Sequence, residues 1–404
     1  METVGKAVSA LLIGYLLGAI HPAYIFAKCL KGIDLRAEGT GKVGTSNLKA
    51  QLGSLWPVAV TAVYDTGKGV ASFWIAQALG LPLPLCYLGG VSAIVGHIFP
   101  FYLQFKGGEG AATACGLVLA SLIGLWLKLP PTIGMADLAA LAGFAGLSYW
   151  AVRRGDVIAV FLVPALAALS LIRFHHEPAA LFAALILGFI FALALKAVIR
   201  HRAFPYLPEN VRWWRVLLRP AGFSFPLLSL WVTKQTLLSL IGSVLALFVL
   251  VDLARLSSSR VQSFFFKRLA NSFKVYKDKE RSRLSSMTLF LLGCFVTFLL
   301  FPLKVAFLAV TFLIFGDLTA KVFGFVGGKT RFFAKTLQGS LGYLGTCSLA
   351  SHLIFAQSFA PFWLGFVGAA AASFVEALPF HVDDNLSVPL LSGIVMVLAQ
   401  VLTG

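Results

Sequence analysis

The sequence predicts an all-α polytopic membrane protein, with seven membrane spans in its N-terminal half and a second helical bundle of about seven spans. Three observations predict this class. Of the 404 residues, 59% are hydrophobic and only 12% are charged. The mean hydropathy is +0.88, far from the balance of a soluble domain. Apolar runs of roughly 20 residues, the length that crosses a bilayer, recur from Val8 to Leu402.

The N-terminal half contains seven apolar runs. They cover residues 8–27, 56–79, 85–103, 111–127, 133–152, 157–172 and 178–197. The first run contains His21 and Pro22 and is followed by further spans rather than by a cleavage site of small residues. It is therefore predicted to be a retained helix and not a signal peptide.

Charge is distributed unequally between alternate loops. The formal net charge is +17, and in the N-terminal half basic residues gather in alternate short loops between spans, around residues 28–49, at Lys106, at 153–154 and at 200–202. The positive-inside rule places these loops in the cytoplasm and the N-terminus outside. Anionic lipids and anionic substrates account for this charge better than nucleic acid does, so a bacterial inner (plasma) membrane location with cytoplasmic active loops is predicted.

Residues 205–215 form a polar and aromatic stretch between the two halves. This composition is typical of an interfacial linker, so the predicted domains are residues 1–204 and 216–404. The predicted spans of the second domain are residues 216–232, 236–254, 287–301, 305–315, 340–357, 362–375 and 386–402. The basic segment 255–283 is predicted to be cytoplasmic, and parity places loops 317–339 and 376–385 on the same side.

Five cysteines are scattered along the chain, and most lie inside apolar runs: Cys29, Cys86, Cys115, Cys294 and Cys347. Their odd number and their spacing suggest neither a disulfide framework nor a metal cluster. They are interpreted as small packing residues.

A glycine-rich loop follows the first span. It runs over residues 34–47 and contains Arg36, Gly39, Gly41 and Gly44. Glycines let backbone N–H groups turn inward around a phosphate, and Arg36 and Lys42 add positive charge. A connector that binds no ligand would show the same composition, so the neighbouring motifs decide between the two interpretations.

Three further features accompany this loop. Asp65 and Lys68 lie within the second span, where ionisable groups are expensive and a functional or paired role is the default. His97 ends the third span, and a second glycine turn with Lys106 follows at residues 105–110. The alternatives are a structural Asp65–Lys68 pair one helical turn apart and a buried, hydrogen-bonded histidine.

The order of these motifs resembles the acyl-phosphate-dependent glycerol-3-phosphate acyltransferase (PlsY-type) family. In this chain they read Gly-Tyr-Leu-Leu-Gly, Asp-x-Arg, Gly-x-Gly-x-x-Gly-x-x-Asn, Asp-x-x-Lys-Gly, Gly-His-x-x-Pro and Phe-Lys-Gly-Gly, within residues 1–204. The resemblance implies a seven-span fold whose cytoplasmic loops bind glycerol-3-phosphate and an acyl phosphate, without a metal or CoA. The residues it places at the site are Arg36, Gly39, Gly41, Gly44, Asn47, Lys68, His97, Lys106 and His201.

The chain departs from this family at several positions. Ala19 and His21 replace the serine and the proline of a Gly-Ser-Ile-Pro element. Lys42 stands at an asparagine position, Glu109 at a lysine position and Phe204 at an asparagine position. These changes leave open an N-terminal domain that keeps the fold without the reaction.

A second set of polar motifs lies in the C-terminal half. Asp317 and Lys321 are followed by glycine and lysine pairs that include Lys329, Lys335 and Gly339. Glu376 and then Asp383, Asp384 and Asn385 come two spans later. Carboxylates, lysines and mobile glycines together favour a metal–nucleotide phosphate site, although Asp383 and Asp384 could simply cap the last helix.

This second set resembles the CTP-dependent polyprenol and lipid kinases, such as dolichol, phytol and diacylglycerol kinases. The resemblance covers residues 212–403 and includes Asp252 and Arg255. It implies phosphoryl transfer from CTP with Mg²⁺ to a lipid alcohol. Asp317, Glu376 and Asp383 would be the Mg²⁺ ligands, and Lys329, Lys335, Gly339, Asp384 and Asn385 would contact the nucleotide or serve in catalysis.

The sequence thus predicts a membrane transferase of lipid biosynthesis that fuses an acyltransferase-like and a lipid-kinase-like domain. Its partners would be membrane lipids, acyl phosphate and glycerol-3-phosphate, with CTP and a lipid alcohol at the second domain. One alternative is that only the C-terminal domain reacts. Another is a lipid transporter or flippase, because intramembrane Asp65, Lys68 and His97 could line a pathway.

Overall fold

The computed structural model describes residues 2–128, 134–174, 176–200, 222–263, 282–355, 362–379 and 382–403. The predicted linker 205–215, His201 and most of the basic segment 255–283 lie outside the described residues. The chain divides into two compact units, of which the first is Met1–Met135 with Ala159–His201. The second is Ala136–Ile158 with Arg202–Gly404, so the two units interleave in sequence.

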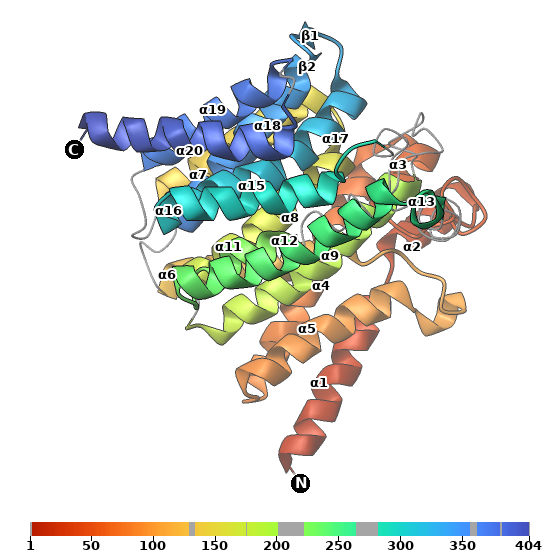
Figure 1. Cartoon of the computed structure of the whole chain (residues 1–404). Helices are drawn as coiled ribbons and strands as arrows, with labels where there is room; N and C mark the ends of the chain where they lie inside the picture. The colour runs from red at the N-terminus through yellow and green to blue at the C-terminus, as the bar shows by residue number, and fades with distance from the viewer. Residues whose placement is uncertain are drawn as a thin grey trace. The chain divides into compact units, whose positions relative to one another are not determined.

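The described part of the chain is helical except for one two-stranded hairpin (Figure 1). Nine of its helices are long and apolar enough to cross a membrane, and Ser286–Leu300 and Trp363–Ala377 are shorter apolar helices. These features confirm the predicted class of all-helical, multi-pass membrane protein.

The first unit consists of helices joined by short turns. Its elements are α1 (Glu2–Ala19), α2 (Pro22–Lys31), α3 (Thr45–Leu52), α4 (Leu55–Ala78), α5 (Leu83–Ile98), η1 (Phe101–Leu103), α6 (Ala111–Lys128), most of α8 (Gly155–Arg173) and α9 (Pro178–Arg200).

The first predicted span is not one straight helix, because it breaks between α1 and α2. Pro22 has no N–H to donate to the carbonyl oxygen of Gly18, one turn earlier, and its ring favours the first turn of a new helix. Lys68 of α4 donates instead to the carbonyl oxygens of Gly18 and Ile20, at 2.9 and 3.2 Å. The break is therefore stabilised from a neighbouring helix.

Glycines let the helices of this unit approach closely. A Cβ at Gly18 would collide with the backbone carbonyl of Ala93, and a Cβ at Gly96 with that of Tyr15. Small residues at such positions allow backbone-to-backbone packing of membrane helices. α1 and α5 pack in this way, which brings the end of α5 next to the α1–α2 break.

The second unit contains the remaining elements. They are α7 (Met135–Val152), α11 (Ser224–Leu228), α12 (Lys234–Ser257), α13 (Ser259–Ser263), α15 (Ser286–Leu300), α16 (Leu303–Thr311), the π-helical turn η5 (Phe312–Gly316), α17 (Asp317–Gly327), β1 (Arg331–Phe332), β2 (Lys335–Thr336), α18 (Leu337–Phe355), α19 (Phe362–Ala377) and α20 (Asp384–Thr403).

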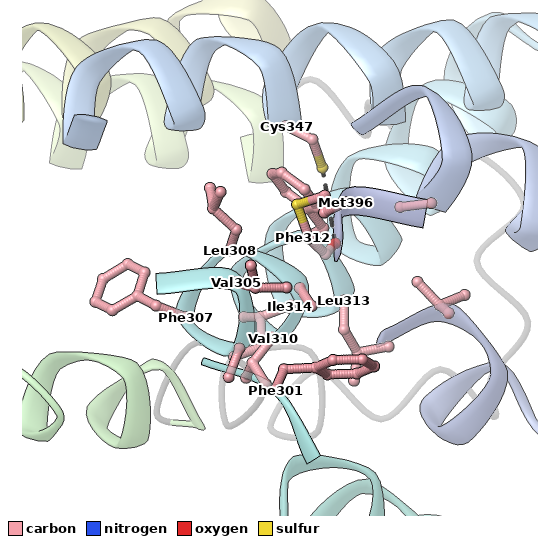
Figure 2. Close-up of a cluster of buried hydrophobic side chains, with 14 of the residues drawn as sticks. Phe301, Val305, Phe307, Leu308, Val310, Phe312, Leu313, Ile314, Cys347 and Met396 are labelled. Atoms are coloured by element: carbon pink, nitrogen blue, oxygen red, sulfur yellow. Dashed lines mark hydrogen bonds between the residues drawn. The ribbon is translucent and has the colours of Figure 1, made fainter. Parts of the chain in front are cut away.

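The core of the second unit surrounds the nearly continuous helix formed by α16, η5 and α17. Buried side chains from α16 and η5 pack against Cys347 of α18 and Met396 of α20 (Figure 2). The Cys347 thiol lies 3.7 Å from the carbonyl oxygen of Phe312 in the π-helical turn. Within Leu303–Gly327, 78% of an apolar 18-residue window is buried inside the protein, so neighbouring helices of the unit cover most of this helix.

The structure corrects three sequence expectations in this unit. The predicted loop 317–339 is wrong at both ends, because α17 extends the helix to Gly327 and α18 already begins at Leu337. Gly339 therefore lies in a helix. The predicted span 216–232 is not a span in its described part, where residues 222–232 hold only the five-residue helix α11 and turns. Pro226 and the small residues around it do not sustain a longer helix there.

Candidate functional site

Asn47 organises the first glycine loop. Its side chain is buried, and its Nδ2 amide lies 3.0 Å from each of three carbonyl oxygens, those of Leu35, Glu38 and Lys42. Its Oδ1 accepts a hydrogen bond from the Thr40 N–H at 3.3 Å. Gly39 and Gly41 have φ values of +56° and +68°, a conformation in which glycine avoids steric cost. The loop is thus held in one shape from within.

The second glycine turn closes on the end of α5. The Gly107 and Gly108 N–H groups donate to the carbonyl oxygens of Ile98 and His97, at 3.1 and 3.0 Å. A Cβ at Gly107 or Gly108 would collide with His97, so both positions require glycine. The Val43 N–H donates to the Gly107 carbonyl oxygen at 3.4 Å. The two glycine turns, which are distant in the sequence, are therefore adjacent.

A buried polar cluster lies behind these turns. Lys68 Nζ is 2.8 Å from Asp65 Oδ1, and His97 Nδ1 is 3.5 Å from the same oxygen. Together with the carbonyl oxygens of Gly18 and Ile20, the Lys68 ammonium has three partners for its three hydrogens. Lys68 therefore has the structural role that the sequence left open, which is to pair with Asp65 and to bind the carbonyl oxygens at the helix break. A contact between Lys68 and substrate stays a prediction.

His21 joins this cluster, although its importance was not predicted. The side chain is buried, and its Nε2 lies 2.9 Å from the carbonyl oxygen of His97. Its Nδ1 lies 2.5 Å from the carbonyl oxygen of Ala19, and its ring centroid is 4.7 Å from that of His97. The available signal was a histidine inside an apolar span, next to a proline that breaks the helix.

Positive charge remains accessible around the turns. Lys106 is exposed and Lys42 is half-buried. Arg36 pairs with Asp34 at 2.7 Å and donates to the Leu103 carbonyl oxygen at 3.0 Å. The hydrogen bonds from Arg36 hold the pKa of the Asp34 carboxyl below its usual value. Gly44 supplies no side chain to cap α3, so the amide dipoles of that helix start also favour an anion.

The charge reversal at Glu109 is compensated within the same unit. Its carboxylate lies 3.7 Å from Lys196 Nζ of α9. Because this partner offsets the negative charge, Glu109 does not oppose an anion as strongly as an unpaired carboxylate would. His201, another predicted site residue, lies outside the described residues.

The multi-pass helical fold and the linked glycine turns, which offer amides and cations to a phosphate, are those of a membrane enzyme with an anionic substrate. Residues 8–204 match the family described as glycerol-3-phosphate acyltransferase. The chain belongs to this glycerol-3-phosphate acyltransferase family, and its N-terminal half is an acyltransferase.

Individual relatives cover the same half of the chain. A glycerol-3-phosphate acyltransferase of Shouchella clausii is 35% identical over 201 residues, which are 48% of this chain and 88% of the relative. That of Desulforudis audaxviator is 34% identical over 47% of this chain and 86% of its own length. A crystal structure of PlsY (YgiH) in its glycerol 3-phosphate form is 26% identical, covers 48% of this chain and 93% of that chain, and has a TM-score of 0.37.

The second unit brings together three of the residues predicted for a kinase-like site. Lys335 Nζ of β2 lies 2.7 Å from Glu376 Oε1 of α19 and 3.4 Å from Asp384 Oδ2 of α20. Burial alone would disfavour the ammonium, but these two carboxylates raise the pKa of Lys335. Glu376 is only 2% exposed, and its second oxygen, Oε2, is buried without a hydrogen-bond partner.

The hairpin that carries Lys335 is fixed by the start of α18. Gln338 Oε1 accepts hydrogen bonds from the N–H groups of Lys329 and Thr330, at 3.2 and 3.3 Å. Thr336 Oγ1 accepts one from the Gly339 N–H at 3.2 Å. Gln338 and Thr336 therefore shape the loop that positions Lys335, while the Lys329 side chain is exposed.

The three carboxylates predicted to bind Mg²⁺, those of Asp317, Glu376 and Asp383, do not converge on one metal site in the described residues. Asp317 pairs with Lys321 at 2.6 Å. Asp383 Oδ1 accepts hydrogen bonds from the backbone and the side-chain amide of Asn385, at 3.1 and 2.6 Å, and so caps α20. Within the described ranges, no group of three or more His, Cys, Asp or Glu residues could hold a metal ion.

Two buried ion pairs of this unit were not predicted as pairs. His352 Nε2 of α18 lies 2.8 Å from Asp137 Oδ1 of α7. Arg255 pairs with Asp252 at 2.9 Å on α12 and also donates to the Arg283 carbonyl oxygen at 2.7 Å. Ionisable residues within apolar runs were the available signal, but their partners lie up to 215 positions away in the sequence.

Proposed function

We propose that the N-terminal unit transfers a fatty acyl group from an acyl phosphate to glycerol-3-phosphate. A hydroxyl oxygen of glycerol-3-phosphate would form the new ester bond to the acyl carbon, and the bond from that carbon to phosphate would break. The hydroxyl proton would leave on the released inorganic phosphate, so atoms and charge balance. The products would be lysophosphatidate and phosphate.

The observation that carries this proposal is the junction of the two glycine turns by the Val43–Gly107 hydrogen bond. Phosphate groups need convergent amides and cations in a fixed geometry, and the junction supplies both next to Arg36, Lys42 and Lys106. Family membership supports the same chemistry. The paired state of Glu109 supports an active rather than a degenerate domain.

The test is acyl transfer by the purified full-length protein in lipid. Radiolabelled glycerol-3-phosphate would be offered with an acyl phosphate, and in parallel with an acyl-CoA. Labelled lysophosphatidate from the acyl phosphate alone is the expected result. Lys106→Ala should raise the KM for glycerol-3-phosphate, because it removes a cation from the second turn, whereas Lys6→Ala, far away at the start of α1, should not. Wild-type protein that gives no labelled lipid would overturn the proposal.

We further propose that the second unit transfers the terminal phosphoryl group of CTP to a membrane alcohol. Glu376 supports this function, because a buried carboxylate with one oxygen on Lys335 and the other without a hydrogen-bond partner is costly unless a ligand uses it. The alcohol oxygen would bond to the γ-phosphorus while the bond from that phosphorus to the β–γ bridging oxygen breaks. CDP would leave with the bridging oxygen, and the alcohol proton would be released to water.

Terminal-phosphate-labelled CTP offered with polyprenol, phytol or diacylglycerol tests this second activity. Transfer of label to lipid is expected, and Lys335→Ala should abolish it while the acyl transfer of the first unit persists. Lys329→Ala is the matched control for general loss of positive charge near the hairpin. Absence of labelled lipid with every alcohol would overturn the kinase proposal and would favour the transport alternative.

Both reactions need soluble phosphate compounds, so we propose that both sites face the cytoplasm of a bacterial-type cell. Cysteines introduced at Lys42 and Asp383 in a cysteine-free background should react with a membrane-impermeant thiol reagent only from the cytoplasmic side. Labelling of the two positions from opposite sides would overturn this arrangement.

A further inference from the structure

His21 occupies a position where the acyltransferase family that this chain resembles has proline. Proline has no side-chain donor, so a relative with proline at this position cannot make the hydrogen bonds of the His21 ring. We propose that His21 is a positioning residue that locks the second glycine turn, Phe105 to Gly110, against the break between α1 and α2. The inference rests on the proposed acyltransferase function for its catalytic consequence, but not for its structural one.

His21 and the second glycine turn donate hydrogen bonds to the same backbone oxygen. The carbonyl oxygen of His97 receives the His21 Nε2 hydrogen bond at 2.9 Å and the Gly108 N–H hydrogen bond at 3.0 Å. Gly107, the neighbouring residue, accepts from Val43 of the first glycine loop. The buried His21 ring is therefore linked to the second glycine turn through the His97 carbonyl oxygen. The Val43–Gly107 hydrogen bond links that turn to the first glycine loop.

The surroundings fix the ring in one orientation. His21 is only 1% exposed, and its other nitrogen faces the Ala19 carbonyl oxygen. A carbonyl oxygen only accepts hydrogen bonds, so His21 acts on the His97 carbonyl as a donor, in the tautomer that carries its proton on Nε2. Because backbone oxygens occupy both ring nitrogens, neither nitrogen is available to a substrate. His21 is thus a positioning residue and not a catalytic base.

Loss of the His21 hydrogen bond should weaken glycerol-3-phosphate binding more than it slows the chemical step. The second turn carries Lys106 and backbone amides, and its freedom to move determines how well they converge on a phosphate. Without the His21 donor, the His97 carbonyl keeps only the Gly108 N–H and the turn loosens. Glycerol-3-phosphate should then bind more weakly, while its bound form should react at a similar rate.

Two substitutions separate the donor from the ring. His21→Phe keeps an aromatic ring of similar size without a donor, and His21→Gln restores an amide donor. Ile25→Ala, on the exposed face of α2, is the control for general effects of mutation near the break. All variants would be measured as full-length protein in lipid.

Hydrogen exchange of the amides in residues 105–110 is the primary measurement. His21→Phe should speed their exchange about tenfold, as expected when one hydrogen bond of ordinary strength is lost, and His21→Gln should recover most of the protection. Exchange in His21→Phe that equals wild type would overturn the inference, whether or not the protein has acyltransferase activity.

Kinetics supply the second measurement. In His21→Phe the KM for glycerol-3-phosphate should rise about tenfold with kcat nearly unchanged, and His21→Gln should lower it again. A fall in kcat at constant KM, or no rescue by glutamine, would contradict the positioning role. Inactive wild-type protein would instead overturn the proposed acyltransferase function, and the exchange experiment would still decide the role of His21.

Discussion

Replacing Asn47 with aspartate should selectively weaken the phosphate site of the first unit. The change preserves the shape of the side chain but exchanges its amide group for a second acceptor. In the structure that amide faces three carbonyl oxygens at 3.0 Å, yet it has only two hydrogens, so it supplies two full hydrogen bonds. At about 1 kcal/mol net for each bond, about 2 kcal/mol of loop stabilisation is lost.

A loss of about 2 kcal/mol corresponds to about a thirtyfold fall in kcat/KM, if the ordered loop is the form that binds glycerol-3-phosphate. The assay is the formation of lysophosphatidate from radiolabelled glycerol-3-phosphate over a range of substrate concentrations. Ser46→Ala, an exposed neighbour on the same helix, is the control and should behave as wild type. Asn47→Asp protein with wild-type kcat/KM would refute the argument that this amide holds the loop.

Three further predictions concern stability. A Cβ at Gly116 of α6 would collide with the Thr66 carbonyl oxygen, whereas a Cβ at Gly124 on the same helix would meet open space. Gly116→Ala should therefore cost about 1–3 kcal/mol of folding free energy and lower the melting temperature. Gly124→Ala is the control and should leave the melting temperature unchanged. Arg255→Met leaves a buried carboxylate uncompensated and should cost about 3–5 kcal/mol, so an unchanged melting temperature would contradict the pairing. The pKa of Lys335 is raised in the folded protein, so its protonated form stabilises the fold. This stabilisation is fully present below the ordinary lysine pKa of 10.5, and it is lost as pH rises through the higher pKa of the folded state. Melting temperature should consequently fall more steeply above pH 10.5 in wild type than in Glu376→Gln, and parallel curves would refute the link.

Lys68 shows how the membrane setting changes the meaning of a charged residue. The sequence allowed a ligand for phosphate or a structural pair. In the structure its ammonium is fully buried among Asp65 and two backbone oxygens that the helix break leaves without partners. A cation that satisfies such oxygens inside apolar surroundings is costly to remove, so its loss should affect folding before it affects substrate affinity.

The sequence by itself determined the class of the protein and the position of its main motifs. Membrane spans are visible because hydropathy is a local, one-dimensional property. The first glycine turn is visible because glycine adopts the left-handed conformations at Gly39 and Gly41 without steric cost. Proline at position 22 also favours a helix break, but the sequence analysis predicted the first span, residues 8–27, as one continuous helix.

Tertiary structure alone decided which residues share a site. The hydropathy of α7 is the same whether it packs in the first unit or in the second, where the structure places it with Asp137 against His352. The extension of α17 beyond Asp317 and the contact of His21 with the His97 carbonyl likewise depend on neighbours distant in sequence. A local pattern fixes which faces are apolar, but the partner of each face is chosen by the packing and hydrogen bonding of the whole unit.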